Sequence, residues 1–106
     1  DVIISGGENI ASVEVERRLD SHPAVLESAV VGRPDEKWGE VPVAFVMLRP
    51  GATTTAEELV DHVRQTLAGF KAPKEVQFGD LPKTSTGKIQ KNVLRERVRG
   101  GPVRPA

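Results

Sequence analysis

Residues 41–48 form the feature that most limits what this chain can fold into. Their sequence, Val-Pro-Val-Ala-Phe-Val-Met-Leu, is apolar at every position. A strand with one face in water alternates apolar and polar residues, whereas a strand covered on both faces is a near-continuous apolar run. We therefore expect a central strand here, with other parts of the chain packed on each side of it.

Helix and strand signals follow on both sides of this run. Ser12 can cap a helix whose first turn is favoured by Glu14 and Glu16. Thr55 and Glu58 form a capping box that opens another helix. The expected helices cover residues 12–21, 55–68 and 90–98. The expected strands cover residues 2–5, 25–31, 41–48 and 74–78, with a turn at 6–9 and a charged loop at 32–37.

This order of elements predicts an α+β domain. We expect a small mixed β-sheet with an N-terminal β-hairpin and about three packed helices. The side chains expected to face the core of the helices recur at helical spacing: Val15, Leu19, Leu59, Val63, Leu67, Val93 and Leu94.

Length and composition narrow the class of protein. A chain of 106 residues allows one small domain with one core. It contains no cysteine, which excludes disulfides and thiolate metal sites, and we expect no metal site. No apolar run approaches the length of about 20 residues that spans a bilayer, and we expect no signal peptide. We expect a cytoplasmic location.

The charges are unevenly distributed along the chain. Residues 83–106 hold seven Lys or Arg and one Glu, whereas residues 1–82 hold eight Lys or Arg and fourteen Asp or Glu. A basic segment on an acidic body is typical of an anionic ligand or partner, and equally of a solvated helix face. Nucleic acid is disfavoured, because one Trp, three Phe and no Tyr offer no stacking platform.

A polar segment at residues 82–89 ends with a candidate functional lysine. Thr84, Ser85, Thr86 and Gly87 predict a flexible loop whose backbone can approach a ligand closely. Lys88 then offers a mobile positive charge to a phosphate or carboxylate. A solvated connection is the ordinary explanation of such a loop. A phosphate-binding P-loop is excluded, because the positions that need Gly and Ser or Thr hold Pro and Ile.

Several short motifs follow one another along the chain. They are Asp1-Val-Ile-Ile-Ser-Gly-Gly-Glu-Asn-Ile10, Val13-Glu-Val-Glu16, His22-Pro-Ala-Val25, Ala29-Val-Val-Gly32, Pro34-Asp35, Trp38-Gly39, Phe70-Lys-Ala-Pro73 and Pro82-Lys-Thr-Ser-Thr-Gly-Lys-Ile89. With them the chain resembles, over residues 1–99, the C-terminal domain of the adenylate-forming enzymes. This family includes acyl-CoA synthetases, adenylation domains of peptide synthetases and firefly luciferase. Residues 100–106 are expected to form a disordered tail.

The resemblance implies an activity in two half-reactions. ATP and a carboxylate give an acyl-adenylate and pyrophosphate, and the acyl group then passes to the thiol of coenzyme A. A large N-terminal domain would hold ATP, Mg²⁺ and the acyl group, while the C-terminal domain swings between two poses. The chain starts without Met, so we expect a piece of a longer protein that is inactive without that N-terminal domain.

Lys88 matches the lysine that serves the adenylation step in the resembling family. The match implies that its ammonium group reaches the substrate carboxylate and the α-phosphate, where it neutralises charge in the transition state. Thr84, Ser85, Thr86 and Gly87 would support it. The resemblance also implies regulation by a lysine acetyltransferase and a deacetylase acting on Lys88, since acetylation removes its charge.

The resemblance assigns the coenzyme A contacts to other residues. Gly7 would let the pantetheine arm pass, with Glu8 beside it, and Trp38 would line the pantetheine tunnel. For the nucleotide end of coenzyme A two assignments compete. Phe70 and Lys74 would stack on adenine and pair with phosphate, although the Arg found between them in some members is Ala72 here. Alternatively, Arg64 would meet the 3′-phosphate.

The N-terminal motif resembles that of medium-chain acyl-CoA ligases more than that of peptide synthetases. The resemblance therefore implies a carboxylate CoA ligase, with a medium-chain fatty acid as the expected substrate. Two alternatives stay open. One is an adenylation domain that loads a phosphopantetheinyl carrier protein instead of free coenzyme A. The other, from a different class, is a non-catalytic binding module that keeps the fold.

Overall fold

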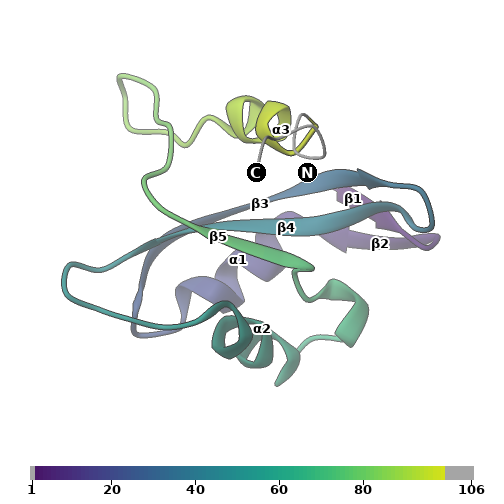
Figure 1. Ribbon diagram of the computed structural model, residues 1–106, viewed down its shortest axis with the longest axis horizontal. Coiled ribbons are helices and arrows are strands. Elements are labelled where there is room, and N and C mark those ends of the chain that lie inside the picture. Colours follow the sequence, from purple (N-terminus) through teal and green to yellow (C-terminus); the bar gives the residue numbers. More distant parts are fainter. Residues whose placement is uncertain (1, 100–106) are drawn as a thin grey trace, which may run out of the picture.

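The computed structural model describes residues 2–99, which form five strands and three α-helices (Figure 1). The strands are β1 (Val2–Ser5), β2 (Glu8–Ala11), β3 (Val25–Asp35), β4 (Gly39–Leu48) and β5 (Glu75–Phe78). The helices are α1 (Ser12–Asp20), α2 (Ala56–Arg64) and α3 (Lys91–Arg99), with a short 3₁₀ helix at Gly69–Lys71. Asp1 and the tail predicted at residues 100–106 lie outside the described residues.

The five strands form one mixed sheet with β4 at its centre. β3 pairs antiparallel with β4 along its whole length, from Val25 opposite Leu48 to Asp35 opposite Gly39. On the other side, β5 pairs parallel with β4, and β1 meets the beginning of β4. β1 and β2 form the N-terminal hairpin. The predicted α+β class with a small mixed sheet and three helices is confirmed.

Helices cover both faces of the sheet. Figure 1 shows α1 and α2 on one side of β3 and β4, and α3 on the other. Successive β4 side chains alternate between the two layers: Ala44 and Val46 belong to the core under α1 and α2, and Val43 and Phe45 to the core under α3. The strand predicted to be covered on both faces is therefore confirmed, and its alternation follows from the pleat.

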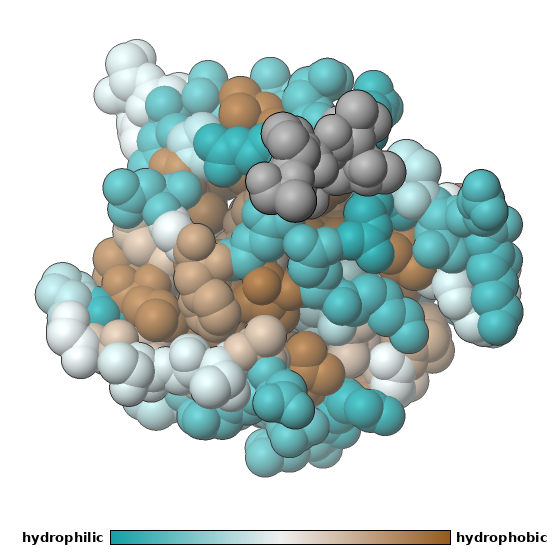
Figure 2. All heavy atoms as spheres, viewed as in Figure 1, coloured by the Kyte–Doolittle hydropathy of each residue, from teal (hydrophilic) through white to brown (hydrophobic). Residues whose placement is uncertain are grey.

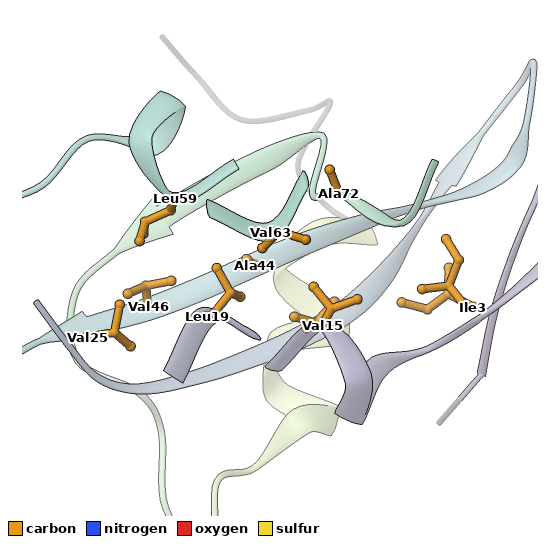
Figure 3. Close-up of a cluster of buried hydrophobic side chains, with 11 residues drawn as sticks. Ile3, Val15, Leu19, Val25, Ala44, Val46, Leu59, Val63 and Ala72 are labelled. Carbon is orange, nitrogen blue, oxygen red and sulfur yellow. The ribbon is translucent and has the colours of Figure 1, made fainter. Parts of the chain in front are cut away.

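The larger of the two cores joins α1 and α2 to the sheet. In Figure 3, Leu19 of α1 and Val63 of α2 meet over Ala44 of β4. Thr55 caps α2 as predicted, because its hydroxyl accepts a hydrogen bond of 3.1 Å from the Glu58 amide. Leu59 and Val63 then point to the core, fully buried.

Two segments predicted as turn or loop are strands instead. The turn expected at residues 6–9 is shorter, since β2 begins at Glu8 and pairs with β1 from Ser5 opposite Glu8. The charged loop expected at residues 32–37 is largely the second half of β3. Pro34 is tolerated there because β3 is paired only with β4 within the described residues, and an edge strand needs no outward amide donor.

Three expected boundaries also differ. Ser12 is the first residue of α1, and its cap position is Ala11, without a side-chain hydrogen bond. α2 ends at Arg64 and not at residue 68, and Gly69 opens the 3₁₀ helix. β5 begins at Glu75, one residue after its expected start, and ends at Phe78 as expected. In each case tertiary packing decides where the element begins or ends, and local signals place such boundaries only to within a few residues.

Apolar residues are exposed on the face of the molecule that Figure 2 shows. Figure 2 shows hydrophobic residues gathered in the middle of this face, with hydrophilic helices and turns at its rim. No helix within residues 2–99 is long and apolar enough to cross a membrane.

Replacing a fully buried leucine should test the larger core. Leu19→Ala removes a side chain with no exposed area, so we expect the free energy of unfolding to fall by about 2–5 kcal/mol. Leu26→Ala is the matched control, because Leu26 is 43% exposed, and it should cost about 0.5 kcal/mol or less. Urea unfolding followed by circular dichroism measures both; equal losses would contradict the described core.

Candidate functional site

The lysine segment forms a closed hairpin, which we call the lysine hairpin (residues 83–89). Lys83 and Ile89 form an antiparallel bridge, and the Gln90 amide donates to the Pro82 carbonyl at 2.8 Å. Inside it, the Thr84 amide donates to the Lys88 carbonyl at 2.8 Å. The sequence predicted a flexible loop, and the hydrogen bonds show an ordered one.

The polar side chains of the lysine hairpin support its tip. The Thr84 hydroxyl accepts a hydrogen bond of 3.1 Å from the Lys88 amide and lies 2.9 Å from the Thr86 hydroxyl. Gly87 has a φ of +91°, which favours glycine over any residue with a side chain. Ser85 is exposed. This turn presents Lys88 to solvent on a backbone that is already folded.

The lysines on either side of Lys88 form ion pairs, whereas Lys88 forms none within residues 2–99. Lys83 forms an ion pair with Glu27 of β3, and Lys91 lies 2.6 Å from a carboxylate oxygen of Glu16 on α1. Among the described residues, Lys88 forms no ion pair. Of the three lysines in this region, Lys88 is the one whose charge is available to an external anion.

A second constellation lies at the turn of the N-terminal hairpin. Gly6 and Gly7 have φ values of +59° and +82°, as a two-residue hairpin turn requires. The Gly6 amide donates to the Trp38 carbonyl at 2.8 Å, and a Cβ at Gly6 would lie 2.9 Å from the indole ring. The ring of Trp38 therefore rests against Gly6. A Cβ at Gly7 would meet no atom within 4 Å.

Trp38 is held in place from the β3–β4 turn. A carboxylate oxygen of Asp35 accepts hydrogen bonds from the amides of Lys37 and Trp38, at 3.0 and 2.8 Å. The ammonium of Lys37 lies 4.9 Å from the centre of the indole ring. The indole is thus oriented although it is 43% exposed.

Four of the predicted coenzyme A residues meet in one pocket, which we call the tryptophan pocket. It has a volume of about 180 Å³ and is lined by Ser5, Gly6, Glu8, Trp38, Phe70 and Lys74. Gly7 lies directly beside it in the hairpin turn. The 3₁₀ helix brings Phe70 to the turns of two hairpins, so this gathering depends on the tertiary structure.

Arg64 lies in a different pocket. This arginine pocket has a volume of about 500 Å³ and runs between α2 and the start of β5. Its lining includes Arg64 and Lys74 but also the carboxylates of Glu57, Asp61 and Glu75. Lys74 therefore borders both pockets, whereas Arg64 does not line the tryptophan pocket.

The structure explains why position 72 holds Ala and not the Arg found in some members of the resembling family. Ala72 is 5% exposed and packs in the core under α1 and α2. An arginine side chain would not fit there without moving its neighbours. The chain consequently offers Lys74, not position 72, as the cation of this segment.

Sequence reasoning missed two residues that shape the tryptophan pocket. Gly6 leaves room for the indole ring of Trp38, and the Gly-Gly pair at residues 6 and 7 was the available signal in the sequence. Lys71 pairs with Glu14 at 2.9 Å and lies 5.8 Å from the centre of the Phe70 ring. Its position next to Phe70 was visible, but its partner on α1 was not.

The lysine hairpin and the tryptophan pocket lie at opposite ends of the sheet. In Figure 1 the lysine hairpin is the light green loop at the upper left, and the turn between β1 and β2 lies at the right. The arrangement suits two steps that use the two ends in turn.

Two groups with shifted pKa values lie outside both places. Burial lowers the pKa of His62, and the charges of Arg18 and His22 act in the same direction. Burial raises the pKa of Asp20, which the hydrogen bond from Ser28 partly offsets. Within residues 2–99, no group of three His, Cys, Asp or Glu residues is placed to hold a metal ion.

Comparisons with known proteins agree on one family. The family model described as AMP-binding enzyme C-terminal domain matches residues 14–88. The chain is 58% identical, over 94% of its length, to 2-methylpropanoate–CoA ligase CCL4 of Humulus lupulus. It is 52% identical, over 97% of its length, to the peroxisomal acetate/butyrate–CoA ligase AAE7 of Arabidopsis thaliana. It spans only 18% and 19% of those relatives.

A solved structure has the same fold. The fatty acyl CoA synthetase of Mycobacterium tuberculosis superposes with a TM-score of 0.88 and is 42% identical. The match covers 95% of this chain and 20% of that chain. The similarity thus concerns one small part of a much longer protein.

Alanine at the two turn glycines should separate backbone strain from contact with Trp38. Gly6→Ala brings a Cβ to 2.9 Å from the indole ring, so we expect the ring to move. Because Trp38 is the single tryptophan of the chain, its fluorescence emission should shift. Gly7→Ala meets no atom and should cost only the strain of positive φ, about 1–2 kcal/mol, with unchanged emission. An equal emission shift in both variants would contradict the packing of the Trp38 indole ring against Gly6.

Proposed function

The chain belongs to the family of AMP-binding enzyme C-terminal domains, and we propose that it is the C-terminal domain of an AMP-forming carboxylate–CoA ligase. The observation that carries the proposal is the exposed Lys88 on an ordered hairpin, at the opposite end of the sheet from the tryptophan pocket. One end would serve adenylation and the other thioester formation. A rotation of the whole domain against its N-terminal domain would exchange them.

In the adenylation step, Lys88 would bind the two anions that must react. A carboxylate oxygen attacks the α-phosphorus of ATP, and pyrophosphate leaves. Negative charge grows on the phosphorus oxygens in the transition state, and a preorganised ammonium stabilises it more than it stabilises the separated reactants. The hydrogen-bonded turn around Thr84 and Gly87 reduces the reorganisation that this requires. The N-terminal domain would hold ATP with Mg²⁺, which neutralises phosphate charge.

In the second step, the tryptophan pocket would receive coenzyme A. The thiol attacks the acyl carbonyl, and AMP leaves. Gly7 offers open space for the pantetheine arm, with Glu8 and the indole of Trp38 at its side. For the nucleotide end, the exposed ring of Phe70 and the ammonium of Lys74 offer stacking and charge in one place. Arg64 is the weaker candidate, because carboxylates share its pocket.

The proposed substrate is an aliphatic carboxylic acid. The sequence motifs favoured a medium-chain fatty acid, and relatives named for 2-methylpropanoate and for acetate and butyrate extend the proposal to short chains. The cytoplasm remains the predicted location, although one relative is named as peroxisomal.

Two alternatives are separable by assay. A domain that loads a carrier protein would transfer the acyl group to a phosphopantetheinyl carrier and not to free coenzyme A. The exposed ring of Phe70 and the ammonium of Lys74 in the tryptophan pocket favour free coenzyme A, because a carrier protein has no adenine nucleotide for them to bind. If the domain is a non-catalytic module of the same fold, replacing Lys88 should change neither pyrophosphate exchange nor thioester formation.

Removing the Lys88 charge should stop the first half-reaction selectively. In the full-length ligase, Lys88→Ala should lower pyrophosphate exchange at least about 100-fold, while thioester formation from supplied acyl-adenylate stays within about twofold of the unchanged enzyme. Lys88→Gln, which imitates acetylation, should lower exchange to a similar extent, because it removes the same positive charge. Arg17→Ala removes one exposed positive charge from α1 and is the matched control. Normal exchange by Lys88→Ala would overturn the proposed mechanism, and exchange by residues 1–106 alone would contradict the need for an N-terminal domain.

A second pair of variants should locate the nucleotide end of coenzyme A. Phe70→Ala removes the stacking surface and should raise the KM for coenzyme A about tenfold, with the KM for ATP unchanged. Arg64→Ala should leave both KM values unchanged. Thioester formation at varied coenzyme A measures this; the reverse pattern would assign the nucleotide to the arginine pocket.

A further inference from the structure

Side chains of α1 line the outer edge of β3. β3 pairs only with β4 within the described residues, so half of its backbone groups point away from the sheet. A carboxylate oxygen of Glu16 accepts a hydrogen bond of 2.9 Å from the Val30 amide. Nearby, the Ser28 hydroxyl donates to Asp20 at 2.7 Å. Glu16 thus satisfies a backbone amide at the strand edge, and Asp20 of the same helix binds a side chain of this strand.

Glu16 also binds a cation from the opposite layer of the protein. The ammonium of Lys91 lies 2.6 Å from the oxygen that accepts the Val30 amide, and it donates to the Ser12 hydroxyl at 3.1 Å. The side chains of Glu16 and Lys91 are 16% and 25% exposed, and Ser12 is 1% exposed. Such a shielded, hydrogen-bonded pair is more strongly oriented than a surface ion pair.

The ion pair between Lys91 and Glu16 connects helices on opposite faces of the sheet. Lys91 is the first residue of α3, whereas Glu16 and Ser12 belong to α1. The two helices cover opposite faces of the sheet (Figure 1). The ion pair therefore passes around the free edge of β3 and ties the start of α3 to α1.

The lysine hairpin is attached to the chain at this same point. Its second leg runs through Ile89, which packs against the core under α3, and then directly into Lys91. Its first leg is tied to β3 by the ion pair of Lys83 with Glu27. Both legs are thus fixed to one edge of the sheet, and Lys88 projects from between them.

We propose that Lys91, bound by Glu16 and Ser12, is a positioning residue that sets the orientation of the lysine hairpin and so of the Lys88 ammonium. The inference rests on the proposed function, since it concerns the adenylation pose. An ammonium that must meet a carboxylate and a phosphate together tolerates little displacement, because small errors in position cost large factors in rate. The link removes freedom from the backbone three residues after Lys88.

A purely structural role of the same pair makes a different prediction. A fold that is merely loosened would lose both half-reactions together and melt at a lower temperature. A displaced Lys88 loses adenylation alone, because thioester formation uses the opposite end of the domain. The two half-reactions of the full-length ligase therefore separate positioning from stability.

The experiment compares Glu16→Gln, Lys91→Ala and their combination in the full-length ligase, beside Lys88→Ala. We expect each single variant to lower the kcat of pyrophosphate exchange about tenfold or more, with the KM for ATP and the rate from supplied acyl-adenylate within about twofold. The double variant should lose no more than Lys91→Ala alone, since both remove one interaction. Lys91→Arg should restore most of the rate, because the guanidinium can bind the same carboxylate.

Glu96→Gln is the matched control on the same helix. It breaks the exposed pair of Glu96 with Arg99, which lies on α3 beyond the link to α1, and should change neither half-reaction. Thermal unfolding of every variant reports on the fold.

The outcomes distinguish this inference from the proposed function. Loss of exchange in Lys88→Ala with normal exchange in Glu16→Gln and Lys91→Ala would overturn the positioning role and leave the function intact. Equal loss of both half-reactions, with a lower melting temperature and no rescue by Lys91→Arg, would also overturn it. Normal exchange in Lys88→Ala would overturn the proposed function and the inference together.

Discussion

Burial of β4 on both faces is the constraint on which the rest of the structure depends. An apolar strand of this kind needs a layer of side chains on each side, and three α-helices within residues 2–99 supply them. α1 and α2 cover one face, and α3 alone covers the other. Since α3 comes last, the chain must pass from the end of β5 around to the far face before it can begin. The lysine hairpin lies in that passage, and its place in space follows from the need to cover β4 twice.

The same arrangement of layers places the residues of the tryptophan pocket at the end of the sheet opposite the lysine hairpin. β3 and β4 are long and antiparallel, so their turn projects beyond the cores and presents Trp38. β1 and β2 extend the sheet beside that turn, which brings Gly6 against the indole. The 3₁₀ helix before β5 places Phe70 in the same pocket. A rigid sheet between the two ends keeps the cation and the pocket apart, as two alternating steps would require.

Ion pairs distinguish three lysines that lie close together in the sequence, namely Lys83, Lys88 and Lys91. Lys83 and Lys91 are tied to carboxylates on β3 and α1, and these pairs fix the two legs of the lysine hairpin. The ammonium of Lys88 stands at the tip, where the ordered turn presents it to solvent. The uneven charge of the chain, basic after residue 82 and acidic before it, is therefore partly resolved inside the domain. The acidic body holds the basic segment in place.

The sequence by itself determined the class of the fold, the central strand at residues 41–48, the capped start of α2 and the family. These depend on local patterns: periodicity, capping residues and motif order. Sequence reasoning also singled out Lys88 from the polar segment that carries it, and four residues of the tryptophan pocket through the resemblance and not through their contacts. Only the tertiary structure decided that β3 continues to Asp35, that Arg64 and Phe70 line different pockets, and that Glu16 holds Lys91. The physical reason is sequence separation: pairing across a sheet edge or between two hairpin turns joins residues whose local signals are independent, so nothing short of the packed chain specifies which of them meet.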